Sequence, residues 1–167
     1  SYGFDINVDV IAGLPGEDAD RLMETLYPII ELAPANITVH TLAVKRASAF
    51  AAANMEALPT DAATAKALER ARQALEQAGY RAYYMYRQKY MKGSLENAGY
   101  TRPGKACLYN IDNMEELCDV LAFGAGAISK RIFFDEARIE RAANIKDLRM
   151  YLERLGDVME RKRALFL

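Results

Sequence analysis

Residues 4–44 contain a strand, a helix and a second strand, and this order limits the possible folds more than any other feature of the sequence. The segment 4–12, FDINVDVIA, alternates apolar and polar residues and then becomes apolar, which predicts a strand. Apolar residues at helical spacing between Leu22 and Ala33 predict a helix, and the acidic residues before them suit its amino end. The β-branched segment 36–44 predicts another strand. Such a unit requires parallel strands joined by a right-handed crossover.

Functional groups in such sheets gather at the carboxyl ends of the strands. The two strand ends here are residues 9–16 and residues 42–47. The pattern therefore predicts where a site lies, although it does not identify the ligand.

The remaining elements follow from helical or alternating spacing and from turn residues. The first is a helix capped by Thr60 and ended by Gly79, with an apolar stripe of Ala65, Leu68, Ala71, Leu75 and Ala78. A strand over 80–90, a loop over 92–105, a short strand over 107–110 and a brief helix over 113–121 follow. A hairpin of 131–134 with 138–142 and a closing helix from Ile145 to about Lys162 complete the chain.

Composition excludes several classes of protein. Twenty-two basic and 23 acidic residues leave a net charge of −1, so no general positive field attracts nucleic acid. Cys107 and Cys118 are too few for a disulfide scaffold or an iron–sulfur cluster, and we predict no metal site. The longest uncharged runs are too short to span a membrane. We therefore expect a soluble, cytoplasmic domain that binds neither nucleic acid nor membrane.

Asp9 and His40 are the polar residues of interest in the first two strands. Asp9 precedes a Gly-Leu-Pro-Gly turn, where its carboxylate either accepts hydrogen bonds from a ribose or an amine, or bonds loop amides. His40, the only histidine, fits a satisfied side chain on a sheet face better than a catalytic residue. A Ser48–His40–Asp9 triad has no nucleophile elbow to support it. The spacing of Gly13 and Gly16 matches neither common nucleotide fingerprint.

Two further segments are unusual in composition. Residues 80–90 hold five tyrosines among basic residues. They either bind RNA, or hold carboxylates against a flat ligand, or pack a sheet with their basic tips in solvent. Residues 122–129, AFGAGAIS, form a small-residue segment that serves either close packing or as a backbone platform beneath a ligand ring.

The segment INVDVIAGLPG over 6–16 resembles the oxygen-independent coproporphyrinogen III oxidases, a family of radical S-adenosylmethionine enzymes. The stretches 34–43, 59–80 and 119–129 agree with this family in order and spacing. The basic tyrosine segment 83–90, followed by GSLEN, is similar to its Gram-positive-type branch. The resemblance covers nearly the whole chain.

The resemblance implies an α/β fold, namely the C-terminal portion of a partial (β/α)6 TIM-like barrel with a C-terminal β-hairpin and helix extension. Residues 1–95 are then the C-terminal half of the barrel, and residues 96–167 are a family-specific extension packed on it. The family's Cys-x3-Cys-x2-Cys loop and Gly-Gly-Thr-Pro segment are not found in this sequence, which begins with Ser1. We therefore expect a C-terminal fragment of the enzyme, inactive alone, whose exposed barrel edges favour dimerisation.

The chemistry implied by the resemblance is the oxidative decarboxylation of two propionates of coproporphyrinogen III to vinyl groups, giving protoporphyrinogen IX in haem biosynthesis. The cofactors are S-adenosylmethionine and a [4Fe–4S] cluster, which together generate a 5′-deoxyadenosyl radical. Asp9 matches the family's carboxylate for the cofactor ribose or nearby polar groups, and Ala43 and Ile128 match positions that line the same cofactor. No catalytic residue is assigned within this chain, and the electron acceptor stays unknown.

Coproporphyrinogen carries four carboxylates, so we expect basic partners for its propionates. Arg46, Arg87 and Lys89 are the hypothetical substrate contacts. The main alternative is a haem-binding, chaperone-like relative without decarboxylase activity. An RNA-binding module that uses the tyrosine-rich strand is disfavoured by the balanced charge.

Overall fold

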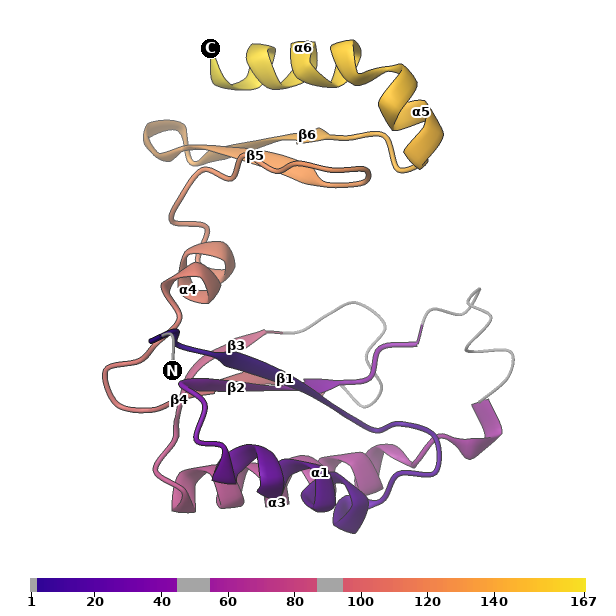
Figure 1. Cartoon of the computed structure of the whole chain (residues 1–167), viewed down its shortest axis with the longest axis vertical. Coiled ribbons are helices and arrows are strands. Elements are labelled where there is room, and N and C mark those ends of the chain that lie inside the picture. Colours follow the sequence, from indigo (N-terminus) through magenta and orange to yellow (C-terminus); the bar gives the residue numbers. More distant parts are fainter. Residues whose placement is uncertain (1–2, 45–54, 87–94) are drawn as a thin grey trace. The chain divides into compact units, whose positions relative to one another are not determined.

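The computed structural model describes residues 3–44, 55–86 and 95–167 (Figure 1). The chain divides into two compact units, Ser1–Leu108 and Tyr109–Leu167. In the described part of the chain, no helix is both long enough and apolar enough to cross a bilayer.

The first unit is built on a four-stranded sheet in the order β1-β2-β4-β3. Its strands are β1 (Asn7–Ala12), β2 (Asn36–Thr41), β3 (Arg81–Tyr86) and β4 (Asn97–Thr101). β1 and β2 are parallel, in a register that pairs Asn7 with Asn36 and Ala12 with Thr41, so the strand–helix–strand prediction is confirmed. β4 is antiparallel to both of its neighbours.

The prediction of a loop over residues 92–105 is wrong where β4 forms. Gly99, which suggested a loop, lies in the middle of this strand opposite Tyr84. A Cβ atom built at Gly99 would overlap the Tyr84 ring, so this glycine provides a close approach between an aromatic ring and the backbone. Glycine inside a strand marks such contacts as well as turns, and composition alone does not separate the two.

Helices α1 (Ala19–Glu31) and α3 (Asp61–Gln77) both cover one face of this sheet (Figure 1), and a 3-10 turn, η1 (Met55–Ala57), precedes α3. The Asp18 side chain accepts a hydrogen bond from the Arg21 amide, and Thr60 accepts one from Ala63, so each helix begins at a capping residue. The predicted Thr60 cap is confirmed. The predicted stripe is partly wrong, because Ala65 is only half-buried and Ala78 is exposed.

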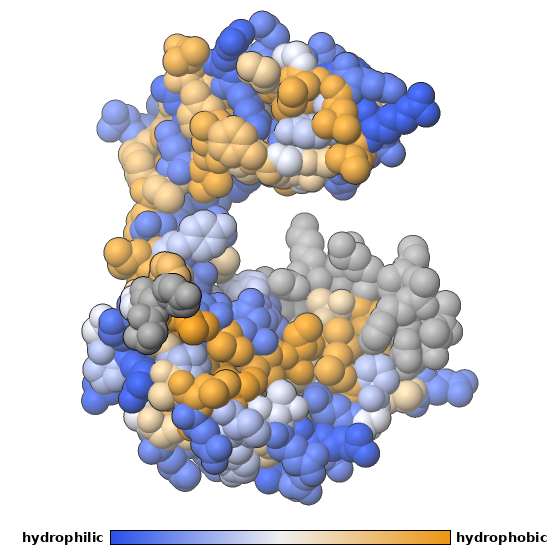
Figure 2. Space-filling view, in the orientation of Figure 1, coloured by the Kyte–Doolittle hydropathy of each residue, from blue (hydrophilic) through white to orange (hydrophobic). Residues whose placement is uncertain are grey.

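The core lies between the helices and the sheet. Figure 2 shows a hydrophobic band on the surface of this unit, next to the hydrophilic outer surface of the helices. The buried members of the core are Val10, Ala12, Leu22, Met23, Leu26, Ile37, Val39, Ala67, Ala71, Leu75, Tyr80 and Tyr100. Alternate residues of β1 and β2 supply it, as a sheet with one apolar face requires.

The second unit contains a β-hairpin and a helical end. The hairpin joins β5 (Ile128–Phe133) and β6 (Arg138–Ala143) through a 3-10 turn, η3 (Phe134–Glu136), and confirms the predicted hairpin. The closing segment forms two helices, α5 (Leu148–Glu153) and α6 (Leu155–Phe166), rather than the single predicted helix. The backbone leaves the helical conformation at Arg154, with φ −115° and ψ 31°.

The short strand predicted over 107–110 and the brief helix predicted over 113–121 are both wrong. A single helix, α4 (Leu108–Met114), takes their place. No residue of α4 is buried, so no apolar stripe marked it in the sequence.

The fold is a mixed α/β arrangement. The described strands form one open sheet and one hairpin, and no closed barrel is present among them. The partial barrel stays a prediction.

Candidate functional site

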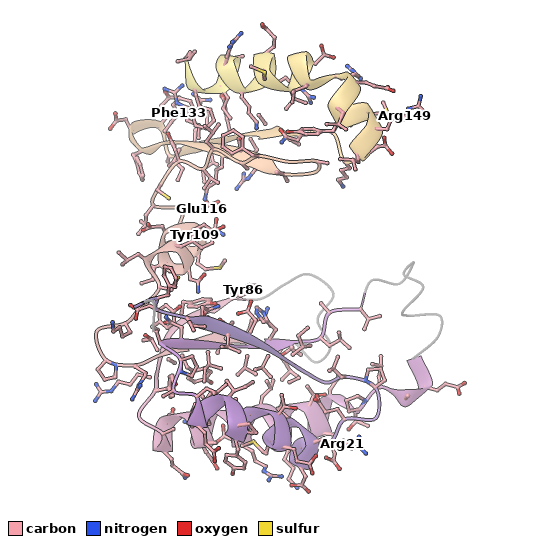
Figure 3. All side chains as sticks on the ribbon, in the orientation of Figure 1. Arg21, Tyr86, Tyr109, Glu116, Phe133 and Arg149 are labelled. Carbon is pink, nitrogen blue, oxygen red and sulfur yellow. The ribbon has the colours of Figure 1, made fainter. Side chains whose placement is uncertain are left out.

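The face of the sheet opposite α1 and α3 carries polar and aromatic side chains. We call it the open face, and its defining residues are Asn7 and Asp9 of β1, Thr38 and His40 of β2, and Tyr84 and Tyr86 of β3. Tyr86 lies on the side of the sheet away from the helices (Figure 3). Within the described part of the first unit, no helix covers this face. Side chains alternate between the two faces of a strand, so the open face collects the residues that the core leaves out.

One set of contacts crosses the open face from Tyr86 to Asp9. The Tyr86 hydroxyl lies 3.2 Å from Nδ1 of His40, and the two rings meet edge to face at 74°. On the other side of the imidazole, Nε2 of His40 lies 3.6 Å from Oδ1 of Asp9. His40 is therefore a half-buried link between a phenol and a carboxylate, which confirms its predicted place on a sheet face.

A second set of contacts reaches the same carboxylate from Tyr84. The Tyr84 hydroxyl lies 3.0 Å from Oγ1 of Thr38, which donates to Oδ1 of Asn7 at 3.4 Å. The Asn7 amide nitrogen then donates to Oδ1 of Asp9 at 2.9 Å. Both sets of contacts cross β2 and end on one oxygen of Asp9.

Asp9 itself is open to ligands. Its side chain is 60% exposed. In the described part of the chain, the partners of Asp9 meet Oδ1, and no hydrogen bond reaches Oδ2. A carboxylate oxygen placed in this way can accept hydrogen bonds from the hydroxyl or amine groups of a ligand.

The tyrosines of β3 form an aromatic surface beside this network. The rings of Tyr84 and Tyr86 stack with centroids 6.2 Å apart and 10° between their planes, and Tyr83 meets Tyr84 edge-on at 4.7 Å. Burial raises the pKa of Tyr84 above its ordinary value, against a smaller opposing effect of the Thr38 hydrogen bond. Tyr84 therefore stays protonated and able to donate.

Asn97 of β4 lies beside the site in register with Tyr86. Its side chain is fully buried, and its Oδ1 accepts from the Thr41 amide at 2.7 Å, which takes the place of a backbone pairing at the end of β2. Among the described residues, its Nδ2 has no hydrogen-bond partner.

The Gly-Leu-Pro-Gly turn after β1 is engaged by the chain itself. The amides of Gly13 and Leu14 both donate to Oε2 of Glu17, at 2.8 and 3.2 Å. Gly13 has φ +88°, a conformation that favours glycine. Because a carboxylate already occupies these donors, the turn is unsuited to holding a phosphate, in agreement with its spacing.

The other predicted site residues have different outcomes. Ala43 follows β2 at its carboxyl end and is half-buried, and Ile128 begins β5 in the second unit and is exposed. Arg46, Arg87 and Lys89, together with Ser48, lie outside the described residues. The assignments of Asp9, Ala43 and Ile128 to a cofactor stay predictions.

The described part of the chain offers no set of side chains that could bind a metal ion or an iron–sulfur cluster. There, no group of three or more His, Cys, Asp or Glu side chains could hold a metal ion. Cys107 is half-buried and Cys118 is exposed, and both are free thiols.

Sequence reasoning found Asp9 but missed the network around it. The signal was present as spacing, because Asn7 and Asp9, Thr38 and His40, and Tyr84 and Tyr86 are each two residues apart in a strand. Such pairs share a face. What the sequence lacks is the order of the strands, which places β3 near enough for its hydroxyls to reach β2.

Comparison with known proteins finds relatives whose names all refer to coproporphyrinogen or heme. The chain is 38% identical over 164 residues to the oxygen-independent coproporphyrinogen-III oxidase-like protein HemZ of Bacillus subtilis, a match that covers 94% of this chain and 32% of that protein. It is also similar to the heme chaperones HemW of Haemophilus influenzae (30% identity, 87% of this chain and 34% of that protein) and Escherichia coli (27%, 94% and 37%). The chain thus spans about a third of the length of these relatives. No family model matches it.

Among solved structures, the coproporphyrinogen III oxidase HemN of Escherichia coli, described as a radical SAM enzyme, shares the fold. The TM-score is 0.63 at 21% sequence identity, and the match covers 92% of this chain and 34% of that one.

Proposed function

We propose that this chain, which belongs to the family of oxygen-independent coproporphyrinogen-III oxidases and their relatives, is part of a radical S-adenosylmethionine enzyme acting on coproporphyrinogen III. The observation that carries the proposal is the Asp9 carboxylate on the edge strand β1 of the open face, held by Asn7 and His40 through one oxygen only. The resemblance implies that this residue contacts the cofactor ribose or nearby polar groups, and we propose the ribose.

The residues present fit that cofactor. A ribose offers two neighbouring hydroxyl groups, and Oδ2 of Asp9 can accept from them. Ala43 and Ile128 are apolar, as expected of residues that line an adenosine group, and we propose both as cofactor contacts. Together with a reduced [4Fe–4S] cluster, S-adenosylmethionine supplies the 5′-deoxyadenosyl radical of this enzyme family. We assign no cluster ligand to the described residues.

The substrate side of the proposal rests on charge and flat surfaces. Coproporphyrinogen has four carboxylates, and Arg46, Arg87 and Lys89 are the basic residues that we propose as their partners. Arg87 directly follows Tyr86, whose ring stacks on Tyr84. This part of the sequence combines basic and aromatic residues, a composition that suits a large anionic ligand.

The test uses the full-length protein, anaerobically, with product analysis for protoporphyrinogen IX. Asp9→Asn keeps the size of the side chain and removes its charge, and we expect product formation at limiting cofactor to fall at least about tenfold, as for the loss of a charge-assisted contact. The matched control is Asp20→Asn, a carboxylate on the outer surface of α1 that should leave turnover unchanged. Equal activity of Asp9→Asn and the unaltered protein would remove the proposed role of Asp9.

A second candidate function is haem binding without decarboxylation, as the names of the HemW relatives indicate. His40 favours it, because a histidine beside stacked tyrosines on an open face offers groups of the kind that ligate haem iron. Haem titration of the full-length protein separates the candidates. A Soret band that shifts in His40→Ala, together with no conversion of coproporphyrinogen, would favour the haem-binding function.

A further inference from the structure

We infer that Tyr84 and Tyr86 are positioning residues, which orient the Asp9 carboxylate through two converging chains of polar contacts and leave Oδ2 free for a hydroxyl group of the ligand. The inference deepens the proposed function and rests on it, because the proposed ligand of Asp9 is the ribose of the cofactor.

The donors of the Tyr84 chain all point in one direction. Thr38 has one hydroxyl hydrogen and donates it to Oδ1 of Asn7, so the Tyr84 hydroxyl must be the donor in its 3.0 Å contact with Thr38. Asn7 in turn donates from Nδ2 to Oδ1 of Asp9. Each donor therefore points toward β1, and this chain of contacts ends on the Asp9 carboxylate.

The charge of Asp9 sets the direction of the Tyr86 chain. With a hydrogen on Nε2, neutral His40 presents a positive edge to Oδ1 of Asp9 at 3.6 Å, and Nδ1 is left to accept from the Tyr86 hydroxyl at 3.2 Å. The other neutral tautomer would place a lone pair against the carboxylate. A protonated imidazole also presents an N–H group to Asp9, so the contact is favourable in either protonation state of His40.

Convergence distinguishes this arrangement from incidental surface contacts. Two chains of polar contacts begin at tyrosines two residues apart on β3, reach β2 and meet at Oδ1 of Asp9 on β1. The tyrosine rings are themselves fixed, since they stack on each other and Tyr84 lies against Gly99. A carboxylate that is 60% exposed would otherwise sample several rotamers, and fixing it before binding reduces the entropy lost when the ligand arrives.

The experiment measures binding of S-adenosylhomocysteine, a cofactor analogue that is not cleaved, to the full-length protein. Tyr84→Phe and Tyr86→Phe remove one hydroxyl each and keep the rings. We expect each to weaken affinity about threefold to tenfold, in line with the loss of one hydrogen bond. Tyr27→Phe is the matched control, because this tyrosine lies exposed on α1, away from both sets of contacts, and we expect unchanged affinity.

Double-mutant cycles then separate a positioning role from a merely structural one. If the tyrosines act through Asp9, Tyr84→Phe and Tyr86→Phe should have no further effect in an Asp9→Asn background. His40→Gln, which retains an N–H donor, should keep most of the affinity of the unaltered protein, whereas His40→Leu should lose it. Urea unfolding of each variant checks that the fold is intact.

The outcomes distinguish the two proposals. If Asp9→Asn weakens binding but the tyrosine variants have no effect, or keep their full effect without the Asp9 carboxylate, the positioning role is wrong and the ribose contact stands. If Asp9→Asn itself leaves affinity unchanged, the ribose contact is wrong and the positioning role falls with it.

Discussion

The two faces of the four-stranded sheet are made by the same strands and have opposite character. On the covered face, Val10, Ile37 and Val39 pack against α1 and α3 and are almost fully buried. On the open face, the neighbouring residues Asp9, Thr38 and His40 form a polar network. Adjacent positions in one strand therefore serve either the core or the candidate site.

This contrast shows how the molecule separates stability from function. The covered face gains from the removal of apolar area from water, which is proportional to area and tolerant of detail. The open face depends on a few directed contacts, each of small net energy but sensitive to atom positions. Substitutions on the two faces should therefore affect different measurements.

The largest effect on unfolding is expected in the core that α1 and α3 form with the covered face. Leu26→Ala and Leu75→Ala each remove a fully buried side chain and should lower the free energy of unfolding by about 2–5 kcal/mol. Asn7→Ala on the open face should cost less than about 1 kcal/mol, as expected for an exposed polar residue. Urea denaturation followed by circular dichroism measures all three, and equal losses on both faces would contradict the contrast.

Gly99→Ala should be next in size, because it affects the open face through the backbone. The added methyl group displaces the Tyr84 ring and with it the contact to Thr38, at a cost of about 1–3 kcal/mol. Combining Gly99→Ala with Tyr84→Ala should cost less than the sum of the single changes, since the clash is then gone. Additive losses would show that Gly99 matters for another reason.

A smaller effect is expected at alkaline pH. Burial raises the pKa of Tyr84 on the open face and of Tyr100 on the covered face above the ordinary value of 10.0. The unfolded chain then releases these protons first, so their contribution to stability is complete below pH 10 and is lost as the pH rises through the folded pKa values. Tyr84→Phe and Tyr100→Phe should each reduce the alkaline loss of stability, and a spectrophotometric titration of the tyrosines should show late-ionising groups. An unchanged pH profile in both variants would contradict this.

The smallest effect is expected at the outer surface of the helices. Arg70 of α3 and Asp20 of α1 form an exposed ion pair at 2.6 Å. Asp20→Ala should lower the free energy of unfolding by less than about 1 kcal/mol, and by less still at high salt. A loss as large as that of Leu26→Ala would place stability outside the covered face.

Local patterns predicted much of this structure. The parallel β1–β2 pair, the Thr60 cap of α3 and the β5–β6 hairpin follow from spacing and turn residues. β4 did not, because Gly99 suggests a loop until the Tyr84 ring that it accommodates is known. α4 lacks a buried side to produce a periodic signal.

The site was predicted to a lesser extent. Asp9 was found from its position at a strand end, whereas His40 was interpreted as a satisfied side chain on a sheet face and not as part of a site. Their link to Tyr84 and Tyr86 depends on β4 being inserted between β2 and β3, an order of strands that no local pattern specifies. Contacts between residues 46 positions apart were therefore beyond spacing rules.

The most direct test of the open face as a ligand surface is a crystal structure of the full-length protein with S-adenosylmethionine bound. We expect ribose hydroxyls within about 2.6–3.2 Å of Oδ2 of Asp9, with Oδ1 still held by Asn7 and His40. A cofactor bound away from this face, with Asp9 contacting none of its atoms, would rule out the open face as the cofactor surface.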